Sequence, residues 1–339
     1  MKAMVLKEIS SIREDTLKLE DLPIPEPGFK QILVKVLICG VCHTELDEIE
    51  GRVSPSKLPI ILGHEIVGRV EQLGPGITKF RKGDRIGISW INWACGECYF
   101  CFHQQENLCL RAKWTGKDVD GGYAQYTVVS EEFAYALPER FSDGEAAPLL
   151  CAGTVGYRAL KLSGLEDGKV LGLYGFGASA HIIIQVAKYL YPDSKVCVFT
   201  RPNQKEHQDL AKQLGADWIG TTGDTPPLKL NCAIDFTPVG IPVKEALRNL
   251  ERGGRLVINA IRKETPIPEL DYALHLWHEK EIKSTANVTR KDAQEFLPLA
   301  AQIPIVPKIQ EFELKDANKA LILVKEGKMR GAGVLKIGD

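Results

Sequence analysis

The stretch Lys169–Leu190 reads KVLGLYGFGASAHIIIQVAKYL, and it decides the fold of the second half of the chain. Lys169–Tyr174 predicts a buried strand, and Ala178–Leu190 has the apolar pattern of a helix. Between them, Gly175-x-Gly177-x-x-Ala180 is a phosphate fingerprint: two glycines allow a tight turn and close backbone approach, and a small third residue lets the helix pack on the strand. Such a turn can be merely structural, but the flanking strand and helix favour dinucleotide binding, with the pyrophosphate at the N-terminal amides of the helix.

Strands and helices continue to alternate after this stretch. The expected strands are Lys195–Thr200, Cys232–Phe236, Arg255–Ala260 and Glu281–Thr285, and the expected helices are Gln204–Leu214 and Val243–Leu250. Alternation of this kind predicts a doubly wound parallel sheet, the Rossmann arrangement. We expect it to occupy residues 149–287.

The N-terminal part of the chain has a different pattern. Gln31–Ile38 and Ile66–Leu73 alternate apolar and polar residues between Pro and Gly punctuation, as in an irregular antiparallel β-barrel. The C-terminal segment returns to this pattern with Lys308–Leu314, a helix at Asp316–Glu326 and a strand at Gly333–Ile337. We therefore expect residues 1–148 and 288–339 to form one domain.

A cysteine-rich lobe at residues 90–110 interrupts the barrel pattern. Its four cysteines follow the spacing C-x2-C-x2-C-x7-C and are Cys95, Cys98, Cys101 and Cys109. Short gaps let successive thiolates aim at one point, so the spacing predicts a closed, structural Zn²⁺ site. Two disulfides or four free thiols are the alternatives, and an iron–sulfur cluster is disfavoured because Leu110, not proline, follows the last cysteine.

Composition limits the function classes. The 339 residues are 44% hydrophobic and 26% charged with a formal net charge of −1, so there is no basic excess to hold nucleic acid or anionic lipid. No apolar run reaches the length of a membrane span, and the N-terminal residues lack the apolar core of a signal peptide. Together with nine cysteines, these features predict a cytoplasmic protein whose thiols stay free for metal.

Two short polar motifs lie within the barrel pattern, Gly40–Glu45 (GVCHTE) and Gly63–Gly68 (GHEIVG). Cys42, His64 and Cys151 could form a second metal site, but they lie far apart in the sequence and spacing cannot join them. Each also has a plainer interpretation, as a buried thiol or a core or surface histidine.

These two motifs, the four-cysteine lobe, Cys151–Tyr157 (CAGTVGY) and the glycine fingerprint occur in the order found in zinc-containing medium-chain alcohol dehydrogenases. The chain resembles that family over essentially its whole length. The resemblance implies a GroES-like β-barrel domain with a Rossmann domain, and a reversible oxidation of alcohols to aldehydes. It also implies a catalytic zinc held by Cys42, His64 and Cys151, which is the two-cysteine, one-histidine set already known for alcohol dehydrogenase.

The resemblance implies further roles. Thr44 would take the proton from the alcohol, and Glu65 would lie behind the metal. His43 and Arg330 would contact the cofactor pyrophosphate. Asp47 stands where many relatives have a histidine that passes the proton to solvent; a carboxylate could do this, or Asp47 could simply be solvent-exposed. Glu45 stands where the family often has an aspartate near the zinc, with a surface carboxylate as the alternative.

Two further parts of the sequence predict the cofactor and the substrate. An NAD enzyme places Asp or Glu at the end of its second strand, but Thr200 and Arg201 stand here and Lys205 follows, which predicts NADP(H) over NAD(H). Trp90, where the family has a pocket-wall residue, predicts small or medium primary alcohols. The alternatives are a polyol or other secondary-alcohol dehydrogenase and, more distantly, a non-catalytic nucleotide-binding zinc protein. We expect a homo-oligomer, either a dimer or a tetramer, and neither a nucleic-acid nor a membrane partner.

Overall fold

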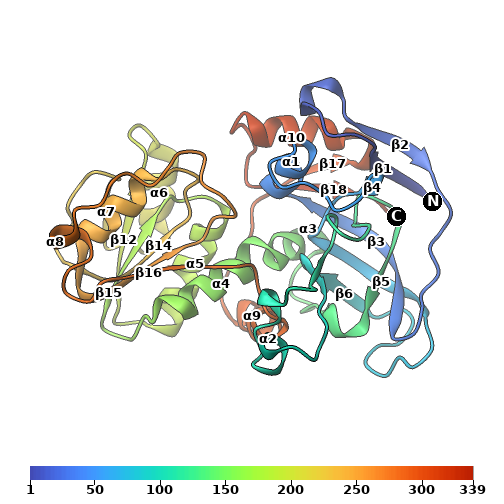
Figure 1. Ribbon diagram of the computed structural model, residues 1–339, viewed down its shortest axis with the longest axis horizontal. Coiled ribbons are helices and arrows are strands. Elements are labelled where there is room, and N and C mark those ends of the chain that lie inside the picture. The colour runs from blue at the N-terminus through green and yellow to red at the C-terminus, as the bar shows by residue number, and fades with distance from the viewer. Residues whose placement is uncertain (339) are drawn as a thin grey trace. The chain divides into compact units, whose positions relative to one another are not determined.

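The computed structural model describes residues 1–338, which divide into two compact units. Unit 1 comprises Met1–Cys151, Thr289–Ala301 and the residues from Val306 onward. Unit 2 comprises Ala152–Val288 and Gln302–Ile305. The chain therefore leaves unit 1 after Cys151, returns to it at Thr289, and adds one further short segment to unit 2 before its C-terminal part (Figure 1).

Unit 1 is built around the long strand β3 (Gln31–Val41), which pairs on its two sides with strands distant in sequence. The sheet runs β10-β6-β5-β3-β18-β17, and β9 also pairs with β3. Its other strands are β5 (Ile66–Leu73), β6 (Arg85–Ile88), β9 (Tyr126–Ser130), β10 (Ala134–Ala136), β17 (Ile309–Glu313) and β18 (Ala332–Lys336). Register shifts between β3 and β5 at Leu33/Val34 and Val36/Ile38 mark bulges of the kind that curve a barrel.

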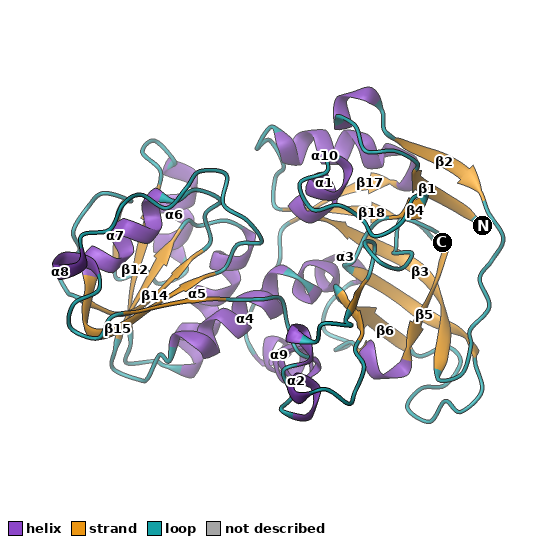
Figure 2. Cartoon of the chain, in the orientation of Figure 1, coloured by secondary structure: helices purple, strands orange, loops and turns teal. Residues whose placement is uncertain are grey.

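Smaller elements complete unit 1 (Figure 2). A three-stranded sheet of order β2-β1-β4 is formed by β1 (Lys2–Leu6), β2 (Leu17–Asp21) and β4 (Ile60–Ile61), while β7 (Ile91–Trp93) pairs with β8 (Lys113–Trp114). The helices are α1 (His43–Ile49), α2 (Tyr99–Phe102), α3 (Asp143–Ala146), α9 (Arg290–Gln302) and α10 (Ala317–Lys325). Short 3-10 turns are η1 (Ile12–Glu14), η2 (Glu106–Leu108), η3 (Glu131–Phe133), η4 (Ala147–Leu150) and η5 (Leu314–Asp316).

Unit 2 is a six-stranded parallel sheet of order β13-β12-β11-β14-β15-β16. Its strands are β11 (Val170–Tyr174), β12 (Lys195–Thr200), β13 (Trp218–Thr221), β14 (Leu230–Asp235), β15 (Leu250–Ile258) and β16 (Glu281–Ser284). Its helices are α4 (Ala152–Ser163), α5 (Ala178–Leu190), α6 (Lys205–Gln213), α7 (Ile241–Asn249) and α8 (Tyr272–His275). The order reverses at β11, as in the doubly wound dinucleotide-binding fold, and Figure 1 shows α6 and α7 covering one face and α4 and α5 the other. The predicted Rossmann fold is thus confirmed.

Several predicted elements differ from those observed. The structure has β13 and α9, which the sequence pattern did not predict: β13 has four half-buried residues without a strong alternation, and α9 contains Pro298, a residue unusual inside a helix. Strand β6 ends at Ile88, and Ser89 and Trp90 separate it from β7. This break places Trp90 outside both strands.

Candidate active site

Three separate parts of unit 1 bring a set of metal-ligating side chains together. Cys42 follows β3 and caps the N-terminus of α1, His64 and Glu65 lie between β4 and β5, and Cys151 follows η4. Their ligand atoms, the two sulfurs, one imidazole nitrogen and one carboxylate oxygen, all lie within 4.8 Å of one another. The imidazole Nε2 of His64 is 3.4 Å from the sulfur of Cys151. The fold therefore joins residues that spacing alone could not.

Local backbone structure explains this convergence. The 3-10 turn η4 ends at Leu150, and Cys151 has non-helical dihedrals (φ −123°, ψ −79°) before α4 begins at Ala152. Gly40 in β3 makes room for Glu65, because a Cβ atom at Gly40 would lie 2.0 Å from the Oε2 atom of Glu65. A glycine is required there for the carboxylate to reach the cluster.

Glu45 is the site residue that the sequence interpretation left undecided. The alternative of a surface carboxylate is wrong, since Glu45 is completely buried. Its Oε1 atom lies 2.5 Å from Nδ1 of His64, and its Oε2 atom accepts a hydrogen bond of 2.8 Å from the backbone N–H of Cys42. Carboxylates in this position orient a ligating histidine and fix its tautomer. The signal in the sequence is capping-box spacing, with Glu45 three residues after the N-cap Cys42.

Burial and mutual contacts shift the pKa values of the groups in this cluster in different directions. The hydrogen bond with Cys151 lowers the pKa of the Cys42 thiol well below its ordinary value, even though burial opposes this change. Burial raises the pKa of Glu65 well above its ordinary value, and the negative Cys42 thiolate raises it further. Two sulfurs, one imidazole and a carboxylate form a donor set that fits Zn²⁺.

The other site residues predicted on α1 lie in different surroundings. Thr44 is buried, and its hydroxyl oxygen is 3.7 Å from the Cys42 sulfur. His43, the first residue of the helix, is exposed. Asp47 is 3% exposed and its Oδ1 accepts a hydrogen bond of 2.5 Å from Nε of Arg52, so the solvent-exposed alternative for Asp47 is wrong.

Trp90 lies between this cluster and the cysteine lobe. Its ring centroid is 5.9 Å from that of His64 and 4.9 Å from that of Trp114 in β8. The backbone carbonyl of Trp90 also accepts a hydrogen bond of 2.7 Å from the N–H of Thr115. Contacts on both sides therefore hold Trp90 next to the ligating histidine.

The four-cysteine lobe forms a second donor cluster within unit 1. The sulfurs of Cys95, Cys98, Cys101 and Cys109 all lie within 4.8 Å of one another. The closest pairs are Cys95–Cys109 at 3.5 Å and Cys98–Cys101 at 3.6 Å. All nine cysteines of the chain lie in the described residues and are free, so these thiols do not form the alternative pair of disulfides. Four converging sulfurs fit a closed tetrahedral zinc site.

Unit 2 carries the features of a dinucleotide site at the first turn of its sheet. Gly175 has φ +82°, which favours glycine, and a Cβ atom there would approach Thr237. Gly177 caps α5 without a side-chain hydrogen bond, and a Cβ atom at this position would meet no atom within 4 Å. Ala180 is fully buried, as a helix packed on the sheet requires. Open space at an uncapped helix N-terminus fits a pyrophosphate.

The end of β12 carries no carboxylate. Thr200 is 1% exposed, and its hydroxyl donates to the carbonyl of Arg201 (3.2 Å) and accepts from Nε2 of Gln208 (3.0 Å). Arg201 and Lys205 are both exposed. Arg330, the other residue predicted to contact the cofactor, belongs to unit 1, is exposed and donates its backbone N–H to Oε1 of Gln310.

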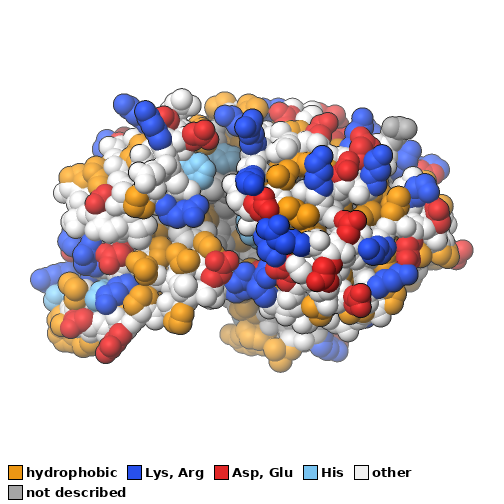
Figure 3. Space-filling view, turned by 90° about the horizontal axis from the view of Figure 1, so that it is seen from above, with side chains coloured by type: hydrophobic (Ala, Val, Ile, Leu, Met, Phe, Trp, Pro, Cys, Tyr) orange, Lys and Arg blue, Asp and Glu red, His pale blue; other side chains and the backbone are white. Residues whose placement is uncertain are grey.

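The surface and helices agree with the composition. On the face drawn in Figure 3, basic and acidic side chains are interspersed. Within residues 1–338, no helix is both long and apolar enough to cross a membrane.

The comparisons with known proteins place the chain in the class of alcohol dehydrogenases, which are oxidoreductases. Residues 28–139 match the alcohol dehydrogenase GroES-like domain. The chain is 44% identical over 319 residues to a probable alcohol dehydrogenase, AdhA, of Mycobacterium tuberculosis (strain CDC 1551 / Oshkosh), an alignment that covers 93% of this chain and 91% of the relative. The protein belongs to the zinc-containing medium-chain alcohol dehydrogenase family, which confirms the resemblance found in its sequence.

Solved structures agree with this assignment. The chain superposes on an NAD-dependent alcohol dehydrogenase with a TM-score of 0.89 and 25% identity, covering 100% of both chains. It superposes on the CAD of Helicobacter pylori, solved as a complex with NADP(H), with a TM-score of 0.87 and 25% identity, covering 99% of both chains. The two neighbours differ in cofactor, so fold similarity does not by itself give the cofactor of this alcohol dehydrogenase.

Proposed function

We propose that this alcohol dehydrogenase is zinc-dependent and reversibly oxidises small or medium primary alcohols to aldehydes, with NADP(H) preferred. The observation that carries the proposal is the convergence of the side chains of Cys42, His64, Glu65 and Cys151 within 4.8 Å. Two cysteines and a histidine hold a catalytic zinc and leave a position open for substrate. Glu65 would lie behind this metal as the fourth donor of the cluster, and the four cysteines of the lobe would hold a second, structural zinc.

The residues of the chain have distinct roles in this proposal. Zinc, when bound, supplies a Lewis acid that lowers the pKa of the alcohol hydroxyl. Glu45 fixes the orientation of His64 through the 2.5 Å contact with its Nδ1 atom. Thr44, beside the Cys42 sulfur, accepts the proton of the hydroxyl through its side-chain oxygen. When bound, the nicotinamide cofactor supplies the hydride acceptor.

Asp47 provides the proton exit that a histidine provides in many relatives. Arg52 holds the Asp47 carboxylate through its Nε atom, and the Arg52 side chain is 32% exposed. An ion pair with one partner at the surface offers a short route from a buried carboxylate to solvent. This placement supports a relay function for Asp47.

We expect backbone amides and basic side chains to bind the cofactor. Within unit 2, the open space at Gly177 and the uncapped start of α5 would receive the pyrophosphate. The roles of His43 and Arg330 of unit 1 as pyrophosphate contacts stay predictions from the family resemblance. At the end of β12, Thr200 removes the repulsion that a carboxylate would exert on a 2′-phosphate. Arg201 and Lys205 are exposed and free to approach this phosphate from solvent.

A cofactor comparison tests the NADP(H) preference. A charged hydrogen bond is worth about 1.5–3 kcal/mol, or about ten- to a hundredfold in affinity. Arg201→Ala should lower kcat/KM for NADP(H) by about this factor and barely change the value for NAD(H). Arg252→Ala, another exposed arginine of unit 2, is the matched control. Equal use of both cofactors by the wild type would refute the preference.

One experiment tests the reaction itself. Purified protein is assayed with a series of alcohols and aldehydes and both cofactors, and its zinc content is measured. We expect two zinc ions per chain and turnover of primary alcohols. One zinc per chain with no turnover would instead identify a non-catalytic nucleotide-binding zinc protein. Faster turnover of secondary alcohols or polyols would identify a polyol or other secondary-alcohol dehydrogenase.

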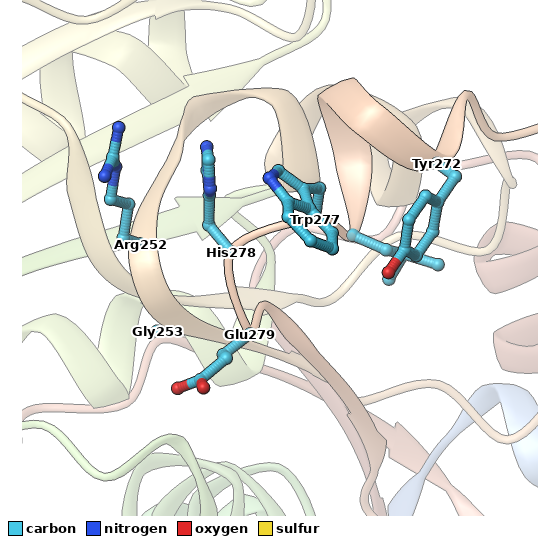
Figure 4. A pocket seen from close by; sticks show the side chains of 7 residues that line it. Arg252, Gly253, Tyr272, Trp277, His278 and Glu279 are labelled. Atoms are coloured by element: carbon cyan, nitrogen blue, oxygen red, sulfur yellow. The ribbon is translucent and has the colours of Figure 1, made fainter.

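We also propose that the chain forms a homo-oligomer through the edge of the unit 2 sheet. All four residues of β16 are exposed, and within the described chain this strand pairs only with β15. Next to it lies a surface hollow lined by aromatic side chains, in which Tyr272 is 63% and Trp277 is 54% exposed (Figure 4). Exposed edges and apolar patches of this kind favour pairing with another chain. Light scattering should give a dimer or tetramer, and Ile282→Lys should lower the oligomer mass.

The free thiols support a reducing compartment. None of the nine cysteines forms a disulfide, and seven of them lie in the two donor clusters or beside them in unit 1. Oxidation would consume the ligands that both zinc ions need, so we propose that the protein works in the cytoplasm.

A further inference from the structure

A buried carboxylate beside the proposed catalytic cluster has no role in the mechanism above. Glu48 lies in α1 and is fully buried. Neither of its carboxylate oxygens has a hydrogen-bond partner among residues 1–338. Burying a carboxyl group without a partner costs free energy, so a position of this kind calls for an explanation.

Helix geometry places Glu48 near the metal ligands. Residues three and four apart share a helix face, so Glu48 lies one turn from Glu45 and from Thr44. Glu45 contacts His64, and Thr44 lies next to the Cys42 sulfur. The charged groups that act on Glu48 are Glu45, His64 and Cys42, together with Lys117 from the segment after β8. Glu48 therefore borders the cluster on which the proposed chemistry depends.

The neighbouring acids of α1 have close partners within the protein. Glu45 is held by His64 and the Cys42 N–H, and Asp47 is held by Arg52. Lys117, the cation that acts on Glu48, forms its ion pair with Asp118 at 3.1 Å. Burial raises the pKa of Glu48 well above its ordinary value, and the Glu45 carboxylate raises it further. Glu48 is thus not a member of the ion pairs that stabilise this helix.

A second polar group near the cluster lacks a partner. The indole Nε1 atom of Trp90 is buried and has no hydrogen-bond partner in the described chain, and the Trp90 ring lies 5.9 Å from that of His64. Substrate sites are mainly apolar with a few polar groups that fix orientation. The Glu48 carboxylate is an acceptor without a partner, and the Trp90 indole N–H is a donor without a partner. A hydroxyl group both donates and accepts hydrogen bonds, so it could pair with both.

We propose that Glu48 is a specificity-determining residue that accepts a hydrogen bond from a second hydroxyl group of the substrate. The preferred substrates are then diols, or the matching hydroxyaldehydes, of which one end is oxidised or reduced. This inference rests on the proposed function and narrows its substrate class. A site built to bind a substrate hydroxyl discriminates against the analogue that lacks it, because the buried polar group then stays unpaired.

Matched substrate pairs test the proposal with the zinc-loaded enzyme. kcat/KM is measured for 1,3-propanediol, 1,4-butanediol and 1,5-pentanediol and for 1-propanol, 1-butanol and 1-pentanol, and each diol value is halved because the diol has two equivalent ends. At one chain length or more, the wild type should prefer the diol by about tenfold or more. A ratio within twofold at every length would overturn the proposal. Failure to oxidise any of the six compounds would instead refute the proposed function.

Variants assign the preference to the carboxyl group. Glu48→Met, of similar length but apolar, should bring the ratio of diol to alcohol close to one and leave the value for the plain alcohol unchanged or higher. Glu48→Gln, whose amide oxygen still accepts a hydrogen bond, should keep part of the preference. A full preference in Glu48→Met would overturn the proposal, as would loss of zinc from Glu48→Gln, which would indicate a role in holding the cluster.

A binding measurement provides an independent readout. Quenching of tryptophan fluorescence reports equilibrium binding of 1,4-butanediol, because the ring of Trp90 lies 5.9 Å from that of His64. The dissociation constant should rise about tenfold or more in Glu48→Met, and by a smaller factor in Glu48→Gln. An unchanged constant would contradict direct contact between Glu48 and the substrate.

Discussion

The two donor clusters of unit 1 differ in how the chain assembles them. The four cysteines of the lobe come from one short segment, whereas Cys42, His64 and Cys151 come from three separate parts of the fold. The lobe offers four sulfurs and no open position, while the second cluster mixes sulfur, nitrogen and oxygen and has a buried carboxylate behind its histidine. A local cluster stabilises the segment that forms it, and a cluster assembled by the whole fold can be aimed at a substrate.

The largest effect is expected from a ligand of the assembled cluster. Cys151→Ala should lower activity by more than a thousandfold and remove one zinc per chain, with little change in melting temperature. The reason is that this ligand contributes to chemistry and lies outside the lobe, whose zinc carries the folding energy. Zinc analysis, kinetics and thermal unfolding check it. Cys232→Ala, a buried thiol of unit 2, is the control, and retention of both zinc ions by Cys151→Ala would contradict the assignment.

Loss of a lobe cysteine should lower stability and leave activity largely unchanged. Cys98→Ala should lower the melting temperature by about 5 °C or more, because a closed zinc site contributes folding free energy directly. At temperatures where the variant remains folded, its kcat should stay within about threefold of the wild type. The melting curve and the kcat are measured on the same preparation. An unchanged melting temperature would show that the lobe does not depend on its metal.

The carboxylate behind His64 should give an intermediate effect. Glu45→Gln keeps one of the two contacts, to the Cys42 N–H or to His64, but cannot keep both with the same geometry. Loss of such a partner costs about ten- to a hundredfold in metal affinity or activity. The matched control is Glu145→Gln, since Glu145 forms the same capping box with Ser142 in α3, away from any ligand. Competition with a zinc chelator measures the effect, and equal behaviour of both variants would mean that Glu45 only caps its helix.

The same contrast explains how much the sequence could predict. Spacing within one segment was enough to predict the lobe, and the glycine fingerprint with its strand and helix was enough for the Rossmann fold, including the bounds of α5 and β12. Cys42, His64 and Cys151 required the family resemblance, because only the folded barrel brings them together. The burial of Glu45 and Glu48 could not be predicted, since a carboxylate in an amphipathic segment looks like a surface residue until the packing of α1 is known.

The smallest effect concerns Trp90. Its ring lies against that of His64, a ligand of the assembled cluster, and against that of Trp114 in β8. An indole here would restrict the space next to the zinc and disfavour branching at the carbinol carbon. Trp90→Ala should therefore raise kcat/KM for 2-propanol relative to 1-propanol by about three- to tenfold, a change of about 1 kcal/mol that is typical of one pocket contact.

The lobe variant supplies the control for this comparison. If the lobe only stabilises the fold, Cys98→Ala should leave the ratio of the two propanols at the wild-type value while the melting temperature falls. If the lobe instead shapes the substrate pocket through the stack of Trp114 on Trp90, Cys98→Ala should shift the ratio in the same direction as Trp90→Ala. The second result would contradict the separation of the two clusters, and an unchanged ratio in Trp90→Ala would remove Trp90 from the pocket wall.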